Sequence, residues 1–430
     1  MTKRNIILTT LLLCVMSSFA SELSDRLKLI KNVKAVSSLT TTHHAEKWTV
    51  TFSHPLDWDN KKTGTFDHRV IVMHRGFDRP TVMVTEGYGA AYALNEKYDE
   101  ELAGILDANI VFVEHRYFLE STPSPCDYTH LTVKNSMGDL HDVRTALKEI
   151  YPNKWLATGI SKGGSTTMYY SAFFPGDVDA YVPYVGPMNT GLQDGRHEHF
   201  LDNVGTVMER SLVRNYQIEM FQAKDKMVPL FEARCAAESL QFRRPIREIY
   251  DYCLLEFPFA FWQWGRSVDE IPSTTTDSDS TMVAYLFKAV GPDYFAVNKN
   301  VNYSFDVQAA KELGYYGYDI LPFTEWLDVK STKNYMHEVF LHDSEQGLTY
   351  DGTANIFTLN YLKNNDPKMI FIYGECDPWS ATGICSWLDF SAKQNMHLFI
   401  DPHGSHKARV NTLPESMKKR ATELIKQWMN

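Results

Sequence analysis

One short segment of the chain combines the residue types needed for nucleophilic catalysis. Residues 159–163 read Gly-Ile-Ser-Lys-Gly, after an apolar stretch at 155–159 and before a segment with helical periodicity that extends to about residue 174. A serine between two glycines at a strand-to-helix turn exposes its hydroxyl at the start of the helix, which is the arrangement found in serine hydrolases. The alternative is a glycine-rich turn in which the serine only caps the helix. Ser161 is therefore the candidate nucleophile.

A serine nucleophile needs a histidine base and a carboxylate that orients it, and in this architecture the acid and then the histidine follow later strands. Asp377 comes just after the apolar stretch 368–373, and His406 comes just after the stretch 396–400. Glu375 and His403 are the local alternatives for the two roles. We favour His406 because the small residues at 404 and 405 would let the loop carry it to the sheet edge.

The remaining requirement is a pair of donors for the oxyanion of the reaction. One is expected to be the backbone N–H of Lys162, directly after the nucleophile, and the other an N–H from the loop after an earlier strand. Residues 85–89, Thr-Glu-Gly-Tyr-Gly, occupy that loop, and the two glycines permit a close backbone approach, so Tyr88 or a neighbour is the expected donor. A plain turn is the alternative reading of this segment.

The elements that must position these residues alternate between strand and helix. Strands are expected at 47–53, 64–75, 81–85, 109–113, 155–159, 181–185, 368–373 and 396–400, and helices at 98–108, 133–150, 161–174 and 413–429. Such alternation with short connections is typical of a mostly parallel sheet flanked by helices. We predict an α/β fold of the α/β-hydrolase type, with a catalytic core formed by residues 21–190 and 356–430 and an inserted helical cap at 191–355.

The length and composition agree with a core and a second substructure. A chain of 430 residues exceeds what one hydrophobic core usually serves, and 44 % hydrophobic residues are enough to build two. Residues 1–20 read as a cleaved secretory signal, with Lys3 and Arg4 before an apolar stretch at 6–16 and a small-x-small site at 18–20. An uncleaved N-terminal anchor or a buried helix is the alternative. No other segment is apolar enough to cross a membrane, so we expect a secreted or periplasmic protein.

The charge and the cysteines narrow the function classes further. Losing residues 1–20 would change the net charge from −10 to −12, which argues against a nucleic-acid partner. The short separations of Cys235 from Cys253 and of Cys376 from Cys385 make disulfides possible in an exported protein, whereas Cys126 has no such neighbour. The pairing stays open. We see no metal-binding spacing of cysteine or histidine, and no cofactor is implied.

Several longer strings resemble a known family. Residues 114–121 (Glu-His-Arg-Tyr-Phe-Leu-Glu-Ser), 85–89 and 374–379 (Gly-Glu-Cys-Asp-Pro-Trp) are similar to secreted bacterial tripeptidyl aminopeptidases of the PS-10 type, as are 74–80, 159–164 and 259–264. Lysosomal Pro-X carboxypeptidases and dipeptidyl peptidase II are more distant relatives. The resemblance implies a serine peptidase that releases short peptides, tripeptides in particular, from free N-termini, with Ser161, Asp377 and His406 as its triad.

Such an exopeptidase must bind an ammonium group at a fixed distance from the nucleophile, and a buried carboxylate does this well. Glu86 and Glu114 lie at the ends of expected central strands and are candidate amine anchors; a structural ion pair with Arg116 or another basic residue is the alternative. Phe261, Trp262 and Trp264 are candidates for a flat pocket that takes proline or another apolar side chain, with packing inside the cap as the alternative.

Two other function classes use the same sequence features. An exported carboxylesterase or lipase would have the same triad but would need no acidic amine anchor. A non-enzymatic binding protein on a hydrolase scaffold is the third reading. The sequence leaves open the number of residues released per cut and the oligomeric state.

Overall fold

A nine-stranded sheet forms the centre of the protein in the computed structural model, which describes residues 21–430. The expected signal segment, 1–20, lies outside the described residues. The strands are β1 (Val33–Leu39), β2 (Glu46–Pro55), β3 (Thr65–His74), β4 (Thr81–Thr85), β5 (Asn109–Val113), β6 (Trp155–Ile160), β7 (Ala180–Tyr184), β8 (Met369–Gly374) and β9 (Met396–Asp401). Their order across the sheet is β1-β2-β3-β5-β4-β6-β7-β8-β9.

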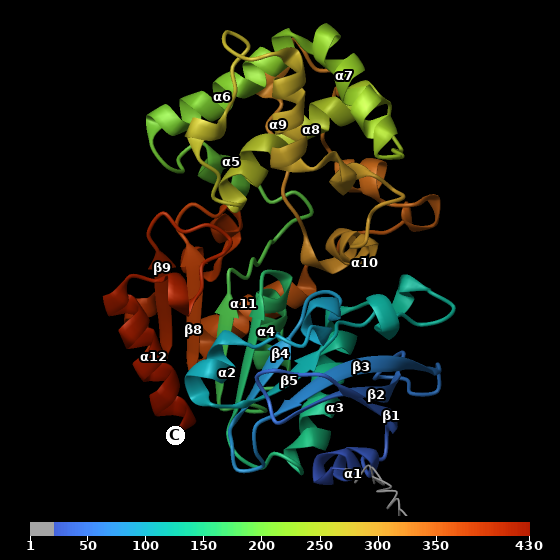
Figure 1. Ribbon diagram of the computed structural model, residues 1–430, viewed down its shortest axis with the longest axis vertical. Coiled ribbons are helices and arrows are strands. Elements are labelled where there is room, and N and C mark those ends of the chain that lie inside the picture. The colour runs from blue at the N-terminus through green and yellow to red at the C-terminus, as the bar shows by residue number, and fades with distance from the viewer. Residues whose placement is uncertain (1–20) are drawn as a thin grey trace, which may run out of the picture.

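The sheet is antiparallel at one side and parallel over the rest. β1, β2, β3 and β5 pair antiparallel, and every pair from β5 through β4 to β9 is parallel. All residues of β4, β5 and β7 are buried, as expected for central strands covered on both faces. The carboxyl ends of the parallel strands meet at one edge of the sheet, and that edge faces the cap (Figure 1). This fold is that of the α/β-hydrolases.

Helices cover both faces of the sheet. They are α1 (Glu22–Lys28), α2 (Glu101–Leu106), α3 (Val133–Lys148), α4 (Lys162–Phe173), α11 (Thr353–Asn364) and α12 (Glu415–Met429). One apolar cluster joins α1, α3, α4 and α11 to one face, and a second joins α2 and α12 to the other. The core therefore has three layers, helix, sheet and helix.

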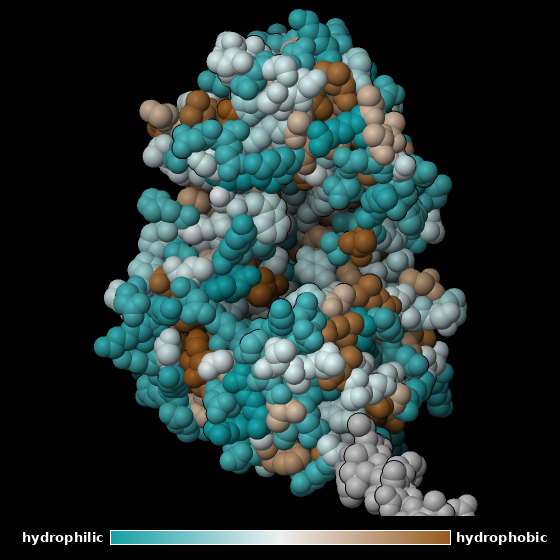
Figure 2. Space-filling view, viewed as in Figure 1, coloured by the Kyte–Doolittle hydropathy of each residue, from teal (hydrophilic) through white to brown (hydrophobic). Residues whose placement is uncertain are grey.

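A separate helical unit lies above the carboxyl edge of the sheet (Figure 1). It contains α5 (Arg196–Leu201), α6 (Val207–Gln222), α7 (Lys224–Ala237), α8 (Ile246–Gln263), α9 (Asp279–Val290) and α10 (Tyr303–Gln308). Its apolar cluster is built almost entirely from its own residues, and the core adds Cys376 and Trp379. We call this unit the cap. Figure 2 shows a hollow between the cap and the core.

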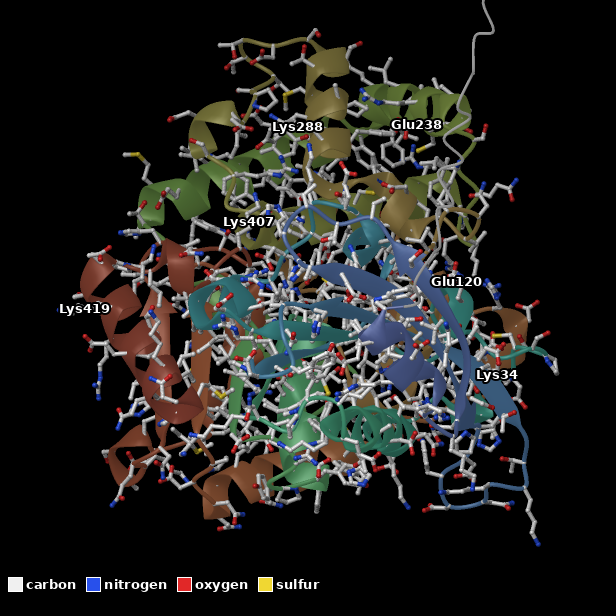
Figure 3. The ribbon with its side chains drawn as sticks, turned by 60° about the horizontal axis from the view of Figure 1, so that its bottom comes forward. Lys34, Glu120, Glu238, Lys288, Lys407 and Lys419 are labelled. Atoms are coloured by element: carbon white, nitrogen blue, oxygen red, sulfur yellow. The ribbon has the colours of Figure 1, made fainter. Side chains whose placement is uncertain are left out.

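Charged side chains lie on the outer surface of both units. The six residues labelled in Figure 3 are all exposed: Lys34, Glu120, Glu238, Lys288, Lys407 and Lys419. Among residues 21–430, none of the helices is long and apolar enough to cross a membrane.

Two sequence-based expectations need correction. β1 was not expected, because it is an edge strand with a half-exposed pattern that lacks clear alternation. The suggested disulfides are also absent from the described residues: Cys126, Cys235, Cys253, Cys376 and Cys385 are all free thiols.

Candidate active site

The candidate nucleophile lies in a strained turn between β6 and α4. Ser161 has φ 58° and ψ −122°, a conformation that few L-residues adopt and that is typical of a nucleophile in this fold. Its N–H donates to the Tyr184 carbonyl oxygen at 2.9 Å, which ties the turn to β7. A Cβ atom at Gly159 would lie 2.3 Å from the Gly163 carbonyl oxygen, so only glycine fits there. The turn therefore holds the serine at the N-terminus of α4.

The candidate acid and base meet at the same sheet edge, in the loops after β8 and β9. His406 Nδ1 is 2.7 Å from Asp377 Oδ2, and the two side chains are 6 % and 0 % exposed. Asp377 Oδ1 also accepts the N–H of Trp379 at 3.2 Å. A carboxylate that accepts from Nδ1–H leaves Nε2 as the basic nitrogen of the imidazole. This arrangement suits a histidine that acts as a general base.

The alternative pair lies in solvent. The His403 side chain is 93 % exposed, and its Nδ1 is 3.9 Å from a carboxylate oxygen of Glu375. The structure therefore brings together Asp377 and His406, and places Glu375 and His403 outside the site.

Ser161 opens into a small aromatic pocket between the core and the cap. Its walls consist of Tyr88, Lys162, Ser165, Tyr169, Pro187, Asn189, Phe305, Leu313, Gly314, Tyr315 and Trp379. Five of these side chains are aromatic, and they come from segments far apart in the chain. Flat apolar walls of this kind suit a ring or another compact apolar group next to the reacting carbonyl.

Comparisons with known proteins identify the family. The family model described as PS-10 peptidase S37 matches residues 17–430. The chain belongs to this family. It is a serine peptidase, and the resemblance found in the sequence strings is confirmed.

A curated relative agrees with this assignment. The peptidase is 26 % identical over 418 residues to the prolyl tri/tetrapeptidyl aminopeptidase of Streptomyces mobaraensis, a match that covers 95 % of this chain and 85 % of the relative.

Among solved structures, the S37 peptidase is similar to the proline iminopeptidase of Mycobacterium smegmatis, with a TM-score of 0.39, 13 % identity, and 88 % and 98 % of the two chains covered. It is also similar to the peroxisomal α/β-hydrolase Lpx1 of Saccharomyces cerevisiae, with a TM-score of 0.39, 12 % identity and 89 % of each chain covered. These similarities are too weak to bear on activity.

The cap aromatics expected to bind substrate do not line the Ser161 pocket. Phe261 is fully buried in the cap cluster. Trp262 lines a different cavity of about 360 Å³, all of whose lining residues belong to the cap. Trp264 is 45 % exposed and packs edge-on against His406, with ring centroids 6.1 Å apart. None of the three lines the Ser161 pocket, because the 257–264 run mainly builds the cap interior.

The two glutamates considered as amine anchors are engaged in other contacts of this peptidase. Glu114 is fully buried and pairs with Arg69, and it also accepts the backbone N–H groups of Ala90 at 2.7 Å and Ser121 at 3.1 Å. Glu86 accepts the N–H of Tyr88 at 3.1 Å and the hydroxyl of Tyr92 at 2.6 Å. Neither glutamate lines the Ser161 pocket.

Arg116 forms its ion pair with Asp139 and not with Glu86 or Glu114. Its guanidinium group is fully buried and binds both carboxylate oxygens of Asp139, at 2.7 and 2.8 Å. Burial opposes ionisation of Asp139, but the charge and hydrogen bonds of Arg116 outweigh it and hold the pKa of that carboxyl well below its usual range. The pair anchors the loop that follows β5.

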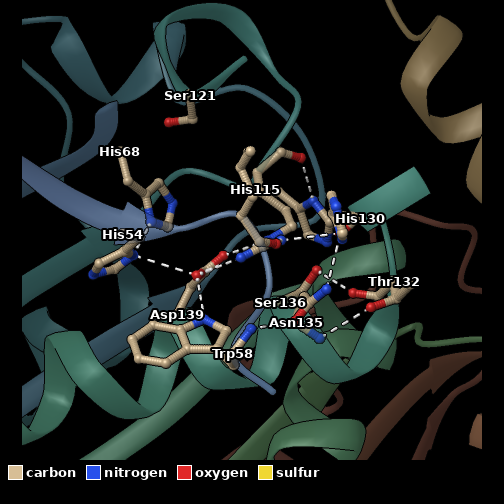
Figure 4. Close-up of polar contacts among 12 residues, drawn as sticks. His54, Trp58, His68, His115, Ser121, His130, Thr132, Asn135, Ser136 and Asp139 are labelled. Atoms are coloured by element: carbon tan, nitrogen blue, oxygen red, sulfur yellow. Dashed lines mark hydrogen bonds and ion pairs between the residues drawn. The ribbon is translucent and has the colours of Figure 1, made fainter. Parts of the chain in front are cut away.

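His54, His68 and Asp139 are the three side chains in the described part of the chain whose spacing could suit a metal ion. Asp139 Oδ1, however, already accepts from Arg116 at 2.8 Å and from Trp58 Nε1 at 2.9 Å (Figure 4). A guanidinium group bound to the carboxylate would repel a divalent cation. This donor set therefore suits a buried ion pair better than a metal site.

The Lys162 side chain makes a contact at the site that the sequence did not indicate. It is 4 % exposed, and its Nζ donates to the Gly87 carbonyl oxygen at 2.6 Å. Burial lowers the pKa of Lys162 to about 7, with the charge of Glu86 opposing the shift. Its backbone N–H is in the first turn of α4, where N–H groups have no partner within the helix. The lysine therefore links the nucleophile turn to the 85–89 loop.

Proposed function

We propose that the protein is an exported aminopeptidase that releases tripeptides from free N-termini through an acyl-enzyme on Ser161. The observation that carries the proposal is the 2.7 Å contact between His406 and Asp377 at the sheet edge that also presents Ser161. Ser161 Oγ attacks the peptide carbonyl carbon while His406 Nε2 takes its proton. The same histidine then protonates the leaving amine, and water hydrolyses the ester. Asp377 keeps the imidazole oriented.

The pocket supports a preference for proline or another compact apolar residue before the cleaved bond. The rings of Phe305, Tyr315 and Trp379 provide flat faces, and none of these three side chains is charged. The Streptomyces mobaraensis relative is named a prolyl tri/tetrapeptidyl aminopeptidase, which agrees with this preference. Substrates with Pro in this position should have a higher kcat/KM than matched substrates with Glu or Lys.

Recognition of a free N-terminus requires a carboxylate that is near the pocket and has no cationic partner. Asp306 borders the pocket without lining it, and the side chain that hydrogen-bonds to it is a neutral amide. It is 3 % exposed, directly follows the pocket residue Phe305, and accepts a hydrogen bond from the Asn300 side-chain amide at 2.5 Å. Burial raises the pKa of Asp306 to about 7. The negative charge of Asp306 in turn contributes to the raised pKa of the pocket residues Tyr88 and Tyr315. A substrate ammonium group would stabilise its charged form, so we assign Asp306 as the amine anchor.

The first experiment measures hydrolysis of chromogenic peptides of one to four residues, each with a free and an acetylated N-terminus. Cleavage of the free tripeptides by wild type and its loss in Ser161→Ala is the expected result. Turnover of simple esters without peptide cleavage would instead favour a carboxylesterase.

A matched pair of histidine variants tests the base. His406→Gln should abolish activity, whereas His403→Gln should leave it near the wild-type value because that side chain is 93 % exposed. Equal losses in both variants would contradict the assignment of His406.

A variant of Asp306 tests the amine anchor. Asp306→Asn keeps the shape of the side chain and removes its charge, so KM for free-amine tripeptides should rise by at least tenfold. Cleavage of any acetylated substrate should change little. An unchanged KM for free tripeptides would exclude Asp306 from this role.

Export is supported by the signal-like composition of residues 1–20. Mass spectrometry of protein recovered from outside the cytoplasm should give Ser21 as the first residue. A chain that retains residues 1–20 would contradict this part of the proposal.

A further inference from the structure

The 85–89 loop offers a different oxyanion donor from the backbone amide expected there. The Tyr88 N–H donates to Glu86 Oε1 at 3.1 Å, and the two groups lie within the same tight loop. An amide held by a carboxylate is not free to bind a developing oxyanion, and a carboxylate behind it adds repulsion if it is ionised. The backbone of Tyr88 is therefore poorly suited to the role.

The side chain of Tyr88 is better placed. Tyr88 and Ser161 line the same pocket. Burial raises the pKa of Tyr88 well above its usual value. The phenol therefore keeps its proton over the range in which a peptidase works. A phenolic proton donor in the pocket that holds the nucleophile is next to the carbonyl that the nucleophile attacks.

Contacts on several sides fix the tyrosine ring. Phe118 packs edge-on at 5.7 Å between centroids, and Phe305 lies 5.6 Å away. The Lys162 ammonium group is 5.7 Å from the ring centroid and donates to the neighbouring Gly87 carbonyl oxygen at 2.6 Å. Because the ring and its loop are both held, little reorganisation is needed when charge develops on the substrate oxygen.

We propose that the phenolic hydroxyl of Tyr88, together with the backbone N–H of Lys162, forms the oxyanion hole. This inference rests on the proposed acyl-enzyme function. When Ser161 Oγ bonds to the carbonyl carbon, the C=O π electrons move to oxygen, and that oxyanion accepts hydrogen bonds from both donors. Tyr88 keeps its proton throughout, and the serine proton goes to His406. When the C–N bond breaks, the carbonyl re-forms.

The test compares Tyr88→Phe with Tyr92→Phe on a free-amine tripeptide anilide. Tyr88→Phe keeps the packed ring and removes only the hydroxyl. Loss of one oxyanion donor should lower kcat by about 10²- to 10³-fold with KM within about threefold of wild type. Tyr92→Phe removes a hydroxyl that binds Glu86 on the same loop, and it should change kcat by less than about fivefold.

A tripeptide aldehyde, which forms a hemiacetal with the nucleophile, provides a second readout. Its Ki should rise in Tyr88→Phe by a factor similar to the fall in kcat/KM. A Tyr88→Phe enzyme with wild-type kcat would overturn the inference, and so would a fall in kcat with an unchanged aldehyde Ki. If wild type does not cleave the anilide, or Ser161→Ala still does, the proposed function itself fails.

Discussion

Glu256 provides the most quantitative prediction. It lies on α8 inside the cap, is 5 % exposed, and accepts hydrogen bonds from the hydroxyl groups of Tyr316 (2.9 Å) and Tyr318 (2.8 Å). None of the salt bridges among residues 21–430 involves it. Burial raises its pKa from 4.5 to about 8, and the two tyrosine hydrogen bonds only partly oppose the shift. The folded protein therefore holds this carboxyl in its neutral form at neutral pH.

The raised pKa makes the stability of the protein depend on pH. In the unfolded chain Glu256 ionises near pH 4.5, whereas in the folded chain it ionises near 8. Its stabilising contribution is thus fully present below pH 4.5 and is lost as the pH rises to about 8. Within that window one extra proton is bound on folding, so the free energy of unfolding falls by about 1.4 kcal/mol per pH unit.

Glu256→Gln removes the ionisable group and keeps the size of the side chain. The free energy of unfolding of the variant, measured by urea denaturation, should increase relative to wild type by about 1.4 kcal/mol per pH unit from pH 5 to 8. Glu232→Gln, at an exposed position of α7, is the matched control and should follow the wild-type curve. A difference between Glu256→Gln and wild type that is constant with pH would refute the reasoning.

Three further predictions concern the site and its support. Asp377→Asn should lower kcat by about 10⁴-fold on a tripeptide anilide, because the neutral amide no longer orients the imidazole; a loss below tenfold would contradict this. Gly159→Ala places a Cβ atom 2.3 Å from the Gly163 carbonyl oxygen, so labelling of the protein by a fluorophosphonate probe should disappear. Arg116→Met leaves Asp139 buried without its cation and should cost about 3–5 kcal/mol in urea denaturation; adding Asp139→Leu should restore part of that loss.

Most elements of the core follow from local sequence patterns, because buried parallel strands are short and continuously apolar. The segments expected at 81–85 and 109–113 match β4 and β5 residue for residue. The helix expected from residue 98 begins at Glu101, because the Glu100 side chain caps it by accepting the N–H groups of Leu102 and Ala103. The strand order was not predictable, since β4 lies between β5 and β6 through contacts distant in sequence.

The candidate triad could be located from sequence because each member directly follows a recognisable strand. The pocket could not, because Tyr88, Tyr169, Phe305, Tyr315 and Trp379 come from separate segments, and only the tertiary structure brings them together. The prediction instead assigned the pocket to the neighbouring aromatic residues Phe261, Trp262 and Trp264. Aromatic residues that follow one another on one helix usually pack in the hydrophobic core, and Phe261 and Trp262 of α8 pack inside the cap.

The cap contributes residues and contacts to the active site itself. Phe305, Leu313, Gly314 and Tyr315 form one side of the pocket, and the His406 N–H donates to the Gln263 carbonyl oxygen at the end of α8, at 3.0 Å. The candidate base is thus held by Asp377 from the core and by Gln263 from the cap. Phe259 of α8 also packs against the pocket residue Trp379, with ring centroids 5.1 Å apart. A substitution that shifts α8 would therefore disturb both this wall and the imidazole, and would reduce kcat even though it changes no residue of the triad.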